Sequence, residues 1–411
     1  MIGFNRKNNS LYVDEVLLSE LASDYGTPSY IYSAKLIKEN FERYSKSLRS
    51  KDLTCYAVKA NPNIEILKLL NEIGSGFDVV SANEIKRTLL AGADSSKIVF
   101  SGVGKTIEEI SFAIDSDILF INIESYNELI KVNDLAIEKK KKVLCSFRLN
   151  PDISAKTHEY ISTGLKTSKF GISRSEIIRI AKTINNLKGI SICGLSCHIG
   201  SQITDPSLSL EVLKKVKACA VELEGLGINI THLNLGGGLG IRYKDEIELS
   251  IEGTINSLIK EIGDDYHLIV EPGRSISGNA GVLISKVELI KETENTSFAL
   301  LNAGMNDFLR PALYNAWHNI TEIEKISTEP KEYIVVGPVC ESSDVFGEKR
   351  NLSIREGSIV AILGTGAYGL TMGSNYNSRT NPPELLVNGS EIKLIRKRES
   401  FEDMIRLEGY N

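Results

Sequence analysis

The sequence predicts a (β/α)8 barrel joined to a β-rich domain. Eight short apolar or β-branched runs lie between residues 55 and 274, and helical patterns lie between them. Strands that alternate with helices are typical of parallel strands with helical crossovers. Eight such strands over about 220 residues fit a barrel of about 250 residues once a closing helix is added. A doubly wound open sheet is the alternative, but it would not need eight strands.

The expected elements follow one another regularly along the chain. The strands are Cys55–Lys59, Phe77–Ser81, Lys97–Ser101, Ile118–Ile123, Val143–Leu149, Ile190–His198, His232–Leu235 and His267–Glu271. The helices are Ile64–Ile73, Ala82–Ala91, Ile107–Asp115, Tyr126–Lys139, Glu176–Leu187, Leu208–Leu226 and Ile251–Ile262. Within them, apolar residues recur at helical spacing, as at Ile107, Ile110 and Ile114. A helix near Ser33–Ser47 is the candidate for the closing helix.

The remaining segments indicate a second domain built from strands. Ser10–Val13 near the N-terminus is strand-like, and apolar residues alternate in several runs after residue 278. Alternation of this kind is typical of half-buried strands. The later runs are Gly281–Val287, Glu332–Val336, Ser358–Leu363 and Glu391–Ile395. We therefore predict a barrel over 29–277 and a β-rich domain formed by 1–28 and 278–411.

Composition and charge argue against several classes of protein. The chain has 411 residues with 48 basic and 53 acidic side chains, and a net charge of −5 argues against a nucleic-acid partner. No apolar run reaches the roughly 18 residues of a membrane-spanning helix. The first residues lack the apolar region of a signal peptide, so we expect a cytoplasmic protein. The six cysteines are scattered and no His-Glu-x-x-His occurs, so no metal site is expected.

Residues capable of chemistry gather where the expected strands end. Barrels of this type place their active sites at the C-terminal ends of the strands. The convergence of so many polar residues and glycines on that face carries more weight than any single motif. The residues are Lys59, Asp78, His198, Ser201, Gly236–Gly240, Glu271, Gly273 and Arg274.

Lys59 and the glycine-rich loop suggest a covalent site with a phosphate cradle. A lysine in a desolvated pocket loses proton affinity and becomes a nucleophile for Schiff-base chemistry. The alternative is a lysine that extends from a strand end into solvent. Gly236–Gly240 offers backbone N–H groups to a phosphate, although such a loop can also be a plain turn. The loops after strands seven and eight are a common phosphate site in barrels, which favours this loop and Gly273–Arg274.

Glu271 and His198 extend this hypothesis to the cofactor. Glu271 is either part of an ion pair, for example with Arg274, or a carboxylate that faces a cationic ring nitrogen, as pyridoxal-phosphate enzymes require. His198 is either a core histidine or a flat ring that stacks on a planar cofactor. Together with Lys59 and the glycine loop, these residues indicate a pyridoxal 5'-phosphate (PLP) site. A phosphosugar aldolase that forms a Schiff base with its substrate is the alternative.

Longer motifs make the sequence resemble the fold-type III PLP-dependent decarboxylases over nearly its whole length. Two segments, Thr157–Gly164 and Ser374–Arg379, resemble the diaminopimelate branch in particular. The Lys59 and glycine-rich motifs are shared more widely in the superfamily. The motifs are Tyr56–Asn61, Phe147–Pro151, Thr157–Gly164, Ser168–Ile172, His198–Gln202, Gly236–Gly240, Glu271–Arg274, Cys340–Asp344 and Gly366–Tyr368.

The resemblance implies a role for each cofactor-binding residue. Lys59 would form the Schiff base with PLP, Asp78 would lie beside the cofactor, and His198 would stack on its ring. Glu271 would pair with the ring nitrogen. The cofactor phosphate or its surroundings would be bound by Ser201, Gly237, Gly238, Gly273 and Arg274. The residues expected to hold the substrate are Arg274, Arg310, Tyr314, Glu341 and Tyr368, of which Tyr368 would also contact the cofactor.

The same resemblance implies the reaction, which is decarboxylation of meso-2,6-diaminopimelate to L-lysine and CO2 in lysine biosynthesis. Arg274 and Arg310 would clamp the distal carboxylate, and Glu341 would take the distal ammonium. Cys340 would reach in from a partner subunit as proton donor, which requires a homodimer. Ser343 stands where a glycine is usual, and it would be strained if that turn needs a positive φ.

Two further functions remain open at this stage. One is decarboxylation of ornithine, arginine or another basic amino acid on the same fold. Such an enzyme would need an acidic group where Arg274 and Arg310 are expected. The other is a catalytically silent PLP-binding relative. The joint presence of four residues argues against it, namely Lys59, Glu271, Cys340 and Tyr368.

Overall fold

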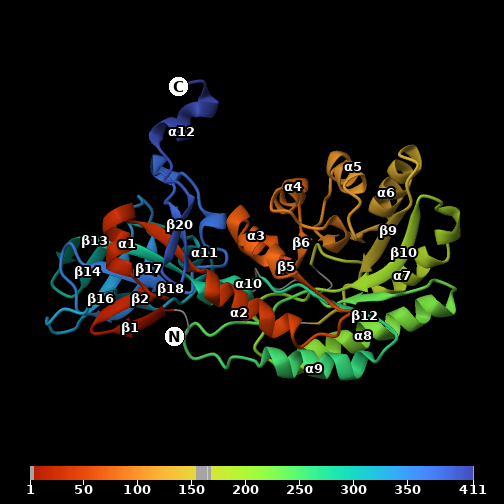
Figure 1. The fold of residues 1–411 in the computed structure, drawn as a ribbon, viewed down its shortest axis with the longest axis horizontal. Helices are drawn as coiled ribbons and strands as arrows, with labels where there is room; N and C mark the ends of the chain where they lie inside the picture. Colours follow the sequence, from red (N-terminus) through yellow and green to blue (C-terminus); the bar gives the residue numbers. More distant parts are fainter. Residues whose placement is uncertain (1–3, 154–163, 165–167, 411) are drawn as a thin grey trace. The chain divides into compact units, whose positions relative to one another are not determined.

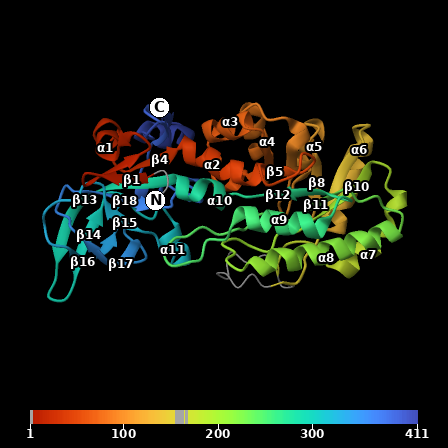
Figure 2. The same cartoon turned by 60° about the horizontal axis from the view of Figure 1, so that its bottom comes forward.

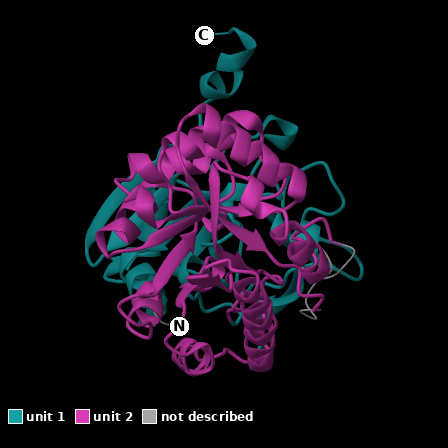
Figure 3. Cartoon of the chain, turned by 90° about the vertical axis from the view of Figure 1, so that its right-hand side faces the viewer, with its two compact units in different colours: residues 1–39, 242–246, 276–411 teal, residues 40–241, 247–275 magenta. Residues whose placement is uncertain are grey.

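The computed structural model describes residues 4–153, 164 and 168–410, and the chain divides into two compact units (Figure 3). One unit, the β-rich unit, comprises residues 1–39, 242–246 and 276–411. The other, the barrel unit, comprises residues 40–241 and 247–275. Residues 29–39 belong to the β-rich unit, because the strand β4 (Ser29–Ser33) pairs there with two later strands.

The barrel unit contains a closed barrel of eight parallel strands, which confirms the predicted fold class (Figure 1). Closure occurs where the last strand, β12, pairs with the first, β5. The strands are β5 (Leu53–Ala57), β6 (Gly76–Val79), β7 (Ile98–Phe100), β8 (Phe120–Ile123), β9 (Val143–Arg148), β10 (Ile190–Ser196), β11 (His232–Asn234) and β12 (His267–Val270). All but β8 end one or two residues before the expected bounds.

Helices follow the barrel strands as predicted and surround them (Figure 3). Their starts are set by side-chain caps: Ser81 accepts a hydrogen bond from the Glu84 N–H, and Thr106 forms a reciprocal capping box with Glu109. The helices are α2 (Ala34–Ser45), α3 (Ile64–Glu72), α4 (Ala82–Leu90), α5 (Ile107–Asp115), α6 (Tyr126–Glu138), α7 (Arg174–Ala181), α8 (Pro206–Gly225), α9 (Ile251–Ile262) and α10 (Arg274–Ser277). Helix α7 begins two residues earlier than expected because Ser173 caps it.

The second unit is rich in strands, as the alternating runs predicted, and its described strands form two sheets. Three short antiparallel strands, β1 (Phe4–Lys7), β2 (Ser10–Val13) and β3 (Val16–Leu17), form the smaller sheet. In the larger sheet β13, β14, β16 and β17 lie side by side (Figure 2). Its strands are β4, β13 (Gly281–Glu292), β14 (Ser297–Leu301), β15 (Ile320–Glu322), β16 (Lys331–Val336), β17 (Val345–Leu352), β18 (Ile359–Leu363), β19 (Glu384–Asn388) and β20 (Glu391–Arg396).

An apolar core joins the two sheets of the β-rich unit. Leu18 of the helix α1 (Leu18–Tyr25) packs in one buried cluster with Ile31, Val282, Ile284 and Leu385. These residues come from β4, β13 and β19, so the N-terminal segment is an integral part of this unit. Two short helices, α11 (Arg310–Tyr314) and α12 (Phe401–Ile405), complete it. Among the described residues, no helix has the length and apolar character needed to cross a membrane.

Candidate active site

A cavity of about 180 Å³ lies at the carboxyl ends of the barrel strands. Four predicted site residues line it, namely Lys59, Asp78, His198 and Glu271. Parallel strands in a barrel present their carboxyl ends on one face, which explains why residues far apart in sequence meet here.

Lys59 and Asp78 form an ion pair inside this cavity. Lys59 lies on a single 3-10 turn directly after β5, and its Nζ donates to Asp78 Oδ2 at 2.5 Å. The pairing of Ala57 with Asp78 between β5 and β6 brings the two residues together. The Asp78 side chain is fully buried, whereas that of Lys59 retains 36% exposure. The lysine amine is therefore accessible from the cavity while its position is fixed by a buried carboxylate.

Glu271 is buried, and one hydrogen bond holds its carboxylate while another holds its backbone. Asn234 Nδ2 donates to its Oε1 at 2.5 Å, and its own N–H donates to the Gly236 carbonyl at 2.7 Å. Burial, followed by the nearby Asp78, raises the pKa of Glu271 to about 8, and Lys59, Asn234 and Arg148 oppose this shift. A carboxylate in such a place needs a cationic partner to become fully ionised.

His198 presents a neutral ring to the same cavity. Burial, reinforced by the charges of Lys59 and Arg148, lowers its pKa to about 3. Its Nδ1 accepts a hydrogen bond from the Gly237 N–H at 3.3 Å, so the proton of the neutral ring is assigned to Nε2. A neutral, flat side chain suits stacking against a planar ligand.

The glycine-rich loop is tightly packed against its neighbours. A Cβ at Gly237 would lie 2.1 Å from the Glu271 carbonyl oxygen, and Gly238 has a φ of +115°. Only glycine fits both positions. Arg274, the first residue of α10, donates from Nε and Nη2 to Ser201 Oγ at 3.1 and 3.0 Å. The predicted phosphate-binding residues thus lie within the barrel unit after β10, β11 and β12.

The cavity fits PLP in its chemistry. It offers an amine at Lys59, a buried carboxylate at Glu271 and a neutral ring at His198. In addition, Asp78 Oδ1, Asn122 Oδ1 and Ser196 Oγ are buried without a hydrogen-bond partner among the described residues. Buried polar atoms of this kind are normally satisfied, so a polar ligand or ordered water is expected there.

Two residues of this site, Arg148 and Asn234, were given no role in the sequence analysis. Arg148 lines the cavity, pairs with Glu124, and places its guanidinium 4.7 Å from the centre of the Phe170 ring. Both residues end barrel strands, β9 and β11. Polar side chains at strand ends were the signal that could have identified them.

Except for Arg274, the predicted substrate-binding residues lie in the β-rich unit. Arg310 is buried, and its Nη1 donates to the Tyr243 hydroxyl at 2.7 Å and lies 2.9 Å from His318 Nε2. Tyr314 lies on the same short helix, α11. Tyr368 adopts a left-handed conformation with a φ of 54°. These contacts orient the Arg310 guanidinium within its own unit.

Cys340 and Glu341 lie on an exposed loop of the same unit. The Cys340 N–H donates to Asn377 Oδ1 at 2.7 Å, and the Tyr376 hydroxyl donates to Glu341 Oε2 at 3.4 Å. Cys340 is the exposed cysteine, whereas the other five are buried. Ser343 does not have a positive φ, so the strain considered for a serine at this position does not arise.

One predicted motif lies mostly outside the described residues. Residues 157–163 of the Thr157–Gly164 motif lie outside the described residues. Among the described residues, no group of three or more His, Cys, Asp or Glu side chains could hold a metal ion.

Comparisons with known proteins place these features in a family. Residues 34–278 match the family model "Pyridoxal-dependent decarboxylase, pyridoxal binding domain". The chain is 43% identical to the diaminopimelate decarboxylase of Haemophilus influenzae, over 98% of this chain and 99% of that relative. The structure of diaminopimelate decarboxylase from Helicobacter pylori complexed with L-lysine superposes with a TM-score of 0.92 at 42% identity, covering 95% of this chain and 99% of that one.

A more distant structure resembles this chain in fold alone. The arginine decarboxylase of Paramecium bursaria Chlorella virus has a TM-score of 0.80 but only 21% identity, covering 90% of this chain and 99% of that one.

The raised pKa of Glu271 predicts a pH dependence for the stability of the cofactor-free protein. Between the ordinary value of 4.5 and about 8, the folded chain binds more protons at this position than the unfolded chain. The contribution of Glu271 to the free energy of unfolding therefore falls as pH rises through this window. Glu271→Gln cannot ionise, so we expect this variant to gain stability relative to the parent as pH rises, measured by thermal denaturation of both proteins without cofactor.

The matched control is Glu72→Gln, at an exposed position of α3. We expect its pH profile to run parallel to that of the parent. A parallel profile for Glu271→Gln as well would contradict the assignment.

Proposed function

Because this chain belongs to the family of pyridoxal-dependent decarboxylases, we propose that it converts meso-2,6-diaminopimelate to L-lysine and CO2 with PLP as cofactor, in the last step of lysine biosynthesis. Identity of 43% with a diaminopimelate decarboxylase along almost the full length of both chains carries this proposal. The gathering of Lys59, Glu271 and His198 in one cavity supports it. The structures of an arginine decarboxylase and of a lysine/ornithine decarboxylase, at 21% and 22% identity, are similar to this chain at the level of fold alone.

The residues of the barrel unit would bind and tune the cofactor. When bound, PLP supplies an electron sink for the electron pair left behind by the departing carboxylate. Lys59 would attach the cofactor, with Asp78 holding its amine in place. The Glu271 carboxylate would face the ring nitrogen and favour its protonated form, which supplies the cation that a buried carboxylate needs. His198 would cover one face of the ring without adding a charge.

The phosphate of the cofactor would be bound by the glycine-containing loops that follow β11 and β12. Gly237, Gly238 and Gly273 allow backbone to approach closely where a side chain would collide. Arg274 adds a positive charge, and its contact with Ser201 fixes the guanidinium plane. Tyr368 of the β-rich unit is also proposed to contact the cofactor.

The substrate has two amino-acid ends, and we assign the distal end to the β-rich unit. Arg310 and Arg274 would bind the distal carboxylate, and Tyr314 would also bind the substrate. Glu341 would bind the distal ammonium. An enzyme that makes a diamine would need no such cations, so Arg310 separates the proposed substrate from ornithine or arginine.

The proposal includes a homodimer with shared active sites. The partner subunit's Cys340 would deliver a proton to the substrate Cα after CO2 has left. The exposure of Cys340 and of Phe401, Leu407 and Tyr410 near the C-terminus is consistent with surfaces that a second copy covers. A cytoplasmic location stays a prediction from the sequence.

The proposed reaction is tested by incubating the purified protein with PLP and meso-diaminopimelate. We expect equal amounts of CO2 and lysine, and no product from ornithine, arginine or lysine in parallel reactions. Consumption of one of those substrates instead would leave the PLP chemistry intact and contradict the substrate. PLP binding without any decarboxylation would favour the silent relative.

Arg310→Ala is expected to lower kcat/KM for diaminopimelate roughly a hundredfold, because it removes about 3 kcal/mol of charge-assisted binding. The dissociation constant of PLP, measured by titrating cofactor-free protein, should change little. Arg179→Ala, which removes an exposed guanidinium from α7, is the control and should leave both values unchanged. Equal losses in turnover and in PLP binding would contradict the role of Arg310.

The shared sites predict complementation between two inactive variants. Lys59→Ala and Cys340→Ala should each lack activity when pure. After mixing and subunit exchange, half of the dimers combine both variants and contain one intact site each, so about a quarter of the parent activity should return. Mixed dimers that form, as measured by mass, but stay inactive would contradict a site that uses the partner subunit's Cys340.

A further inference from the structure

We propose that Asn234 is a positioning residue that orients the Glu271 carboxylate and fixes the start of the glycine-rich loop with a single amide group. The inference rests on the proposed roles of Glu271 and of the glycine loop toward PLP. It assigns to Asn234 a function that is separate from contact with the cofactor or the substrate.

Both the nitrogen and the oxygen of the Asn234 side-chain amide form hydrogen bonds. Asn234 is the last residue of β11 and is 1% exposed. Its Nδ2 donates to Glu271 Oε1 at 2.5 Å, and its Oδ1 accepts from the Gly236 N–H at 2.9 Å. A flipped amide would turn an oxygen toward the carboxylate and an NH2 group toward the N–H donor. Only one orientation of the amide therefore satisfies both neighbours.

Backbone hydrogen bonds connect Asn234, Gly236 and Glu271 with the neighbouring strand ends. The Glu271 N–H donates to the Gly236 carbonyl at 2.7 Å, and the Cys197 N–H donates to the Asn234 carbonyl at 2.8 Å. The Gly237 N–H in turn donates to His198 Nδ1. Asn234 thus stands between the carboxylate proposed for the ring nitrogen, the loop proposed for the phosphate and the ring proposed for stacking. A shift of its side chain would move the first two relative to each other.

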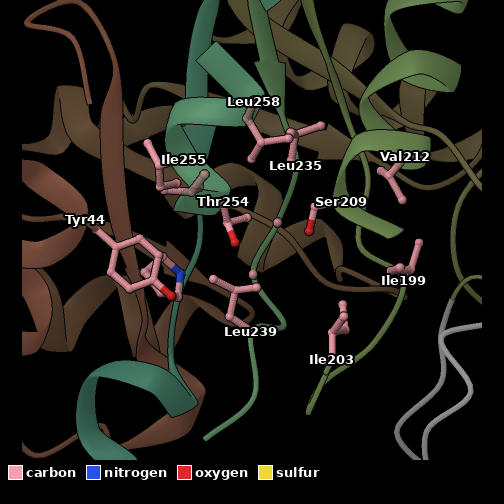
Figure 4. A pocket seen from close by; sticks show the side chains of 14 residues that line it. Tyr44, Ile199, Ile203, Ser209, Val212, Leu235, Leu239, Thr254, Ile255 and Leu258 are labelled. Atoms are coloured by element: carbon pink, nitrogen blue, oxygen red, sulfur yellow. The ribbon is translucent and has the colours of Figure 1, made fainter. Parts of the chain in front are cut away.

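Leu235, the residue after Asn234, holds the opposite face of the chain. Successive residues of a strand point to opposite faces, so Leu235 points away from the cofactor cavity. It lines a second, mainly apolar pocket together with Val212 of α8 and Ile255 and Leu258 of α9 (Figure 4). The chain is therefore held by apolar packing on one face and by the Asn234 amide on the other, just before the loop begins.

The chemistry at this position distinguishes asparagine from aspartate. An aspartate could accept the Gly236 N–H equally well, but it has no hydrogen to donate to Glu271 unless it is protonated. The charged groups that act on Glu271 are Asp78 of β6, Lys59 after β5 and Arg148 of β9. Because one carboxylate already acts unfavourably on Glu271, a second one at position 234 would disfavour its ionised form further.

The inference is tested with Asn234→Asp and Asn234→Ala, using the dissociation constant of PLP from cofactor-free protein and the absorption spectrum of the loaded protein across pH. We expect both variants to weaken PLP binding between about tenfold and a hundredfold, as is usual for a lost hydrogen bond to a charged group. The loss in Asn234→Asp should grow as pH rises and both carboxyl groups ionise. The loss in Asn234→Ala should follow pH less steeply.

Asn133→Ala is the matched control. Asn133 is another buried asparagine of the barrel unit, and its Oδ1 accepts the Gly189 N–H at 2.9 Å, but it does not line the cofactor cavity. We expect it to leave PLP affinity and spectrum unchanged. If Asn133→Ala weakens PLP binding as much as the Asn234 variants, the effect is a general loss of structure and the inference is overturned.

A double-mutant cycle with Glu271→Gln separates positioning from mere support of the fold. If Asn234 acts through the Glu271 carboxylate, Asn234→Ala should change PLP affinity much less in the Glu271→Gln background than in the parent. Additive losses would overturn the inference, as would an Asn234→Asp protein that binds PLP with parent affinity and spectrum. Asn234→Asp preserves the shape of the side chain and supports the test if the alanine variant does not fold.

These readouts do not depend on the substrate. A parent protein that fails to release lysine from diaminopimelate would contradict the proposed function while leaving the PLP titrations interpretable. Normal decarboxylation combined with unaffected PLP binding in both Asn234 variants would contradict only the inference.

Discussion

The burial of charge at the carboxyl end of one barrel is the constraint on which the rest of this site depends. Asp78 and Glu271 are both buried, and neither could remain there as an isolated anion. Asp78 meets this condition by pairing with Lys59. Glu271 instead accepts a hydrogen bond from the Asn234 amide and has a raised pKa, so a cationic partner would favour its ionised form. A protonated ring nitrogen is such a cation.

Close approach of the backbone is the second constraint, and it explains the glycines. Gly237 leaves no room for a Cβ against the Glu271 carbonyl, and Gly238 requires a positive φ. The loop can therefore lie directly against the end of β12 and turn its N–H groups toward other partners, as Gly237 does toward His198. The neutral state of His198 follows from the same crowding, because burial among the cations of Lys59 and Arg148 disfavours a further positive charge.

The sequence determined the architecture because strand and helix periods and their alternation are local properties. The order of eight strands, the helices between them and the residues at each strand end, such as Lys59, His198 and Glu271, could be predicted without coordinates. The longer motifs added the cofactor, the family and a role for each residue. Strand ends were predicted less well: β5 stops at Ala57, and Lys59 lies on the turn that follows.

Tertiary structure decided which of these side chains touch. The contact between Asn234 and Glu271 spans 37 positions, and it depends on β11 and β12 being neighbours in register. Glu271 and Lys59 act on each other because the closure of the barrel pairs β12 with β5, the last strand with the first. The pairing of Arg148 with Glu124 and its position over the Phe170 ring likewise follow only from the fold. Hydrogen bonds and pKa values depend on distance in space, and a sequence pattern carries only distance along the chain.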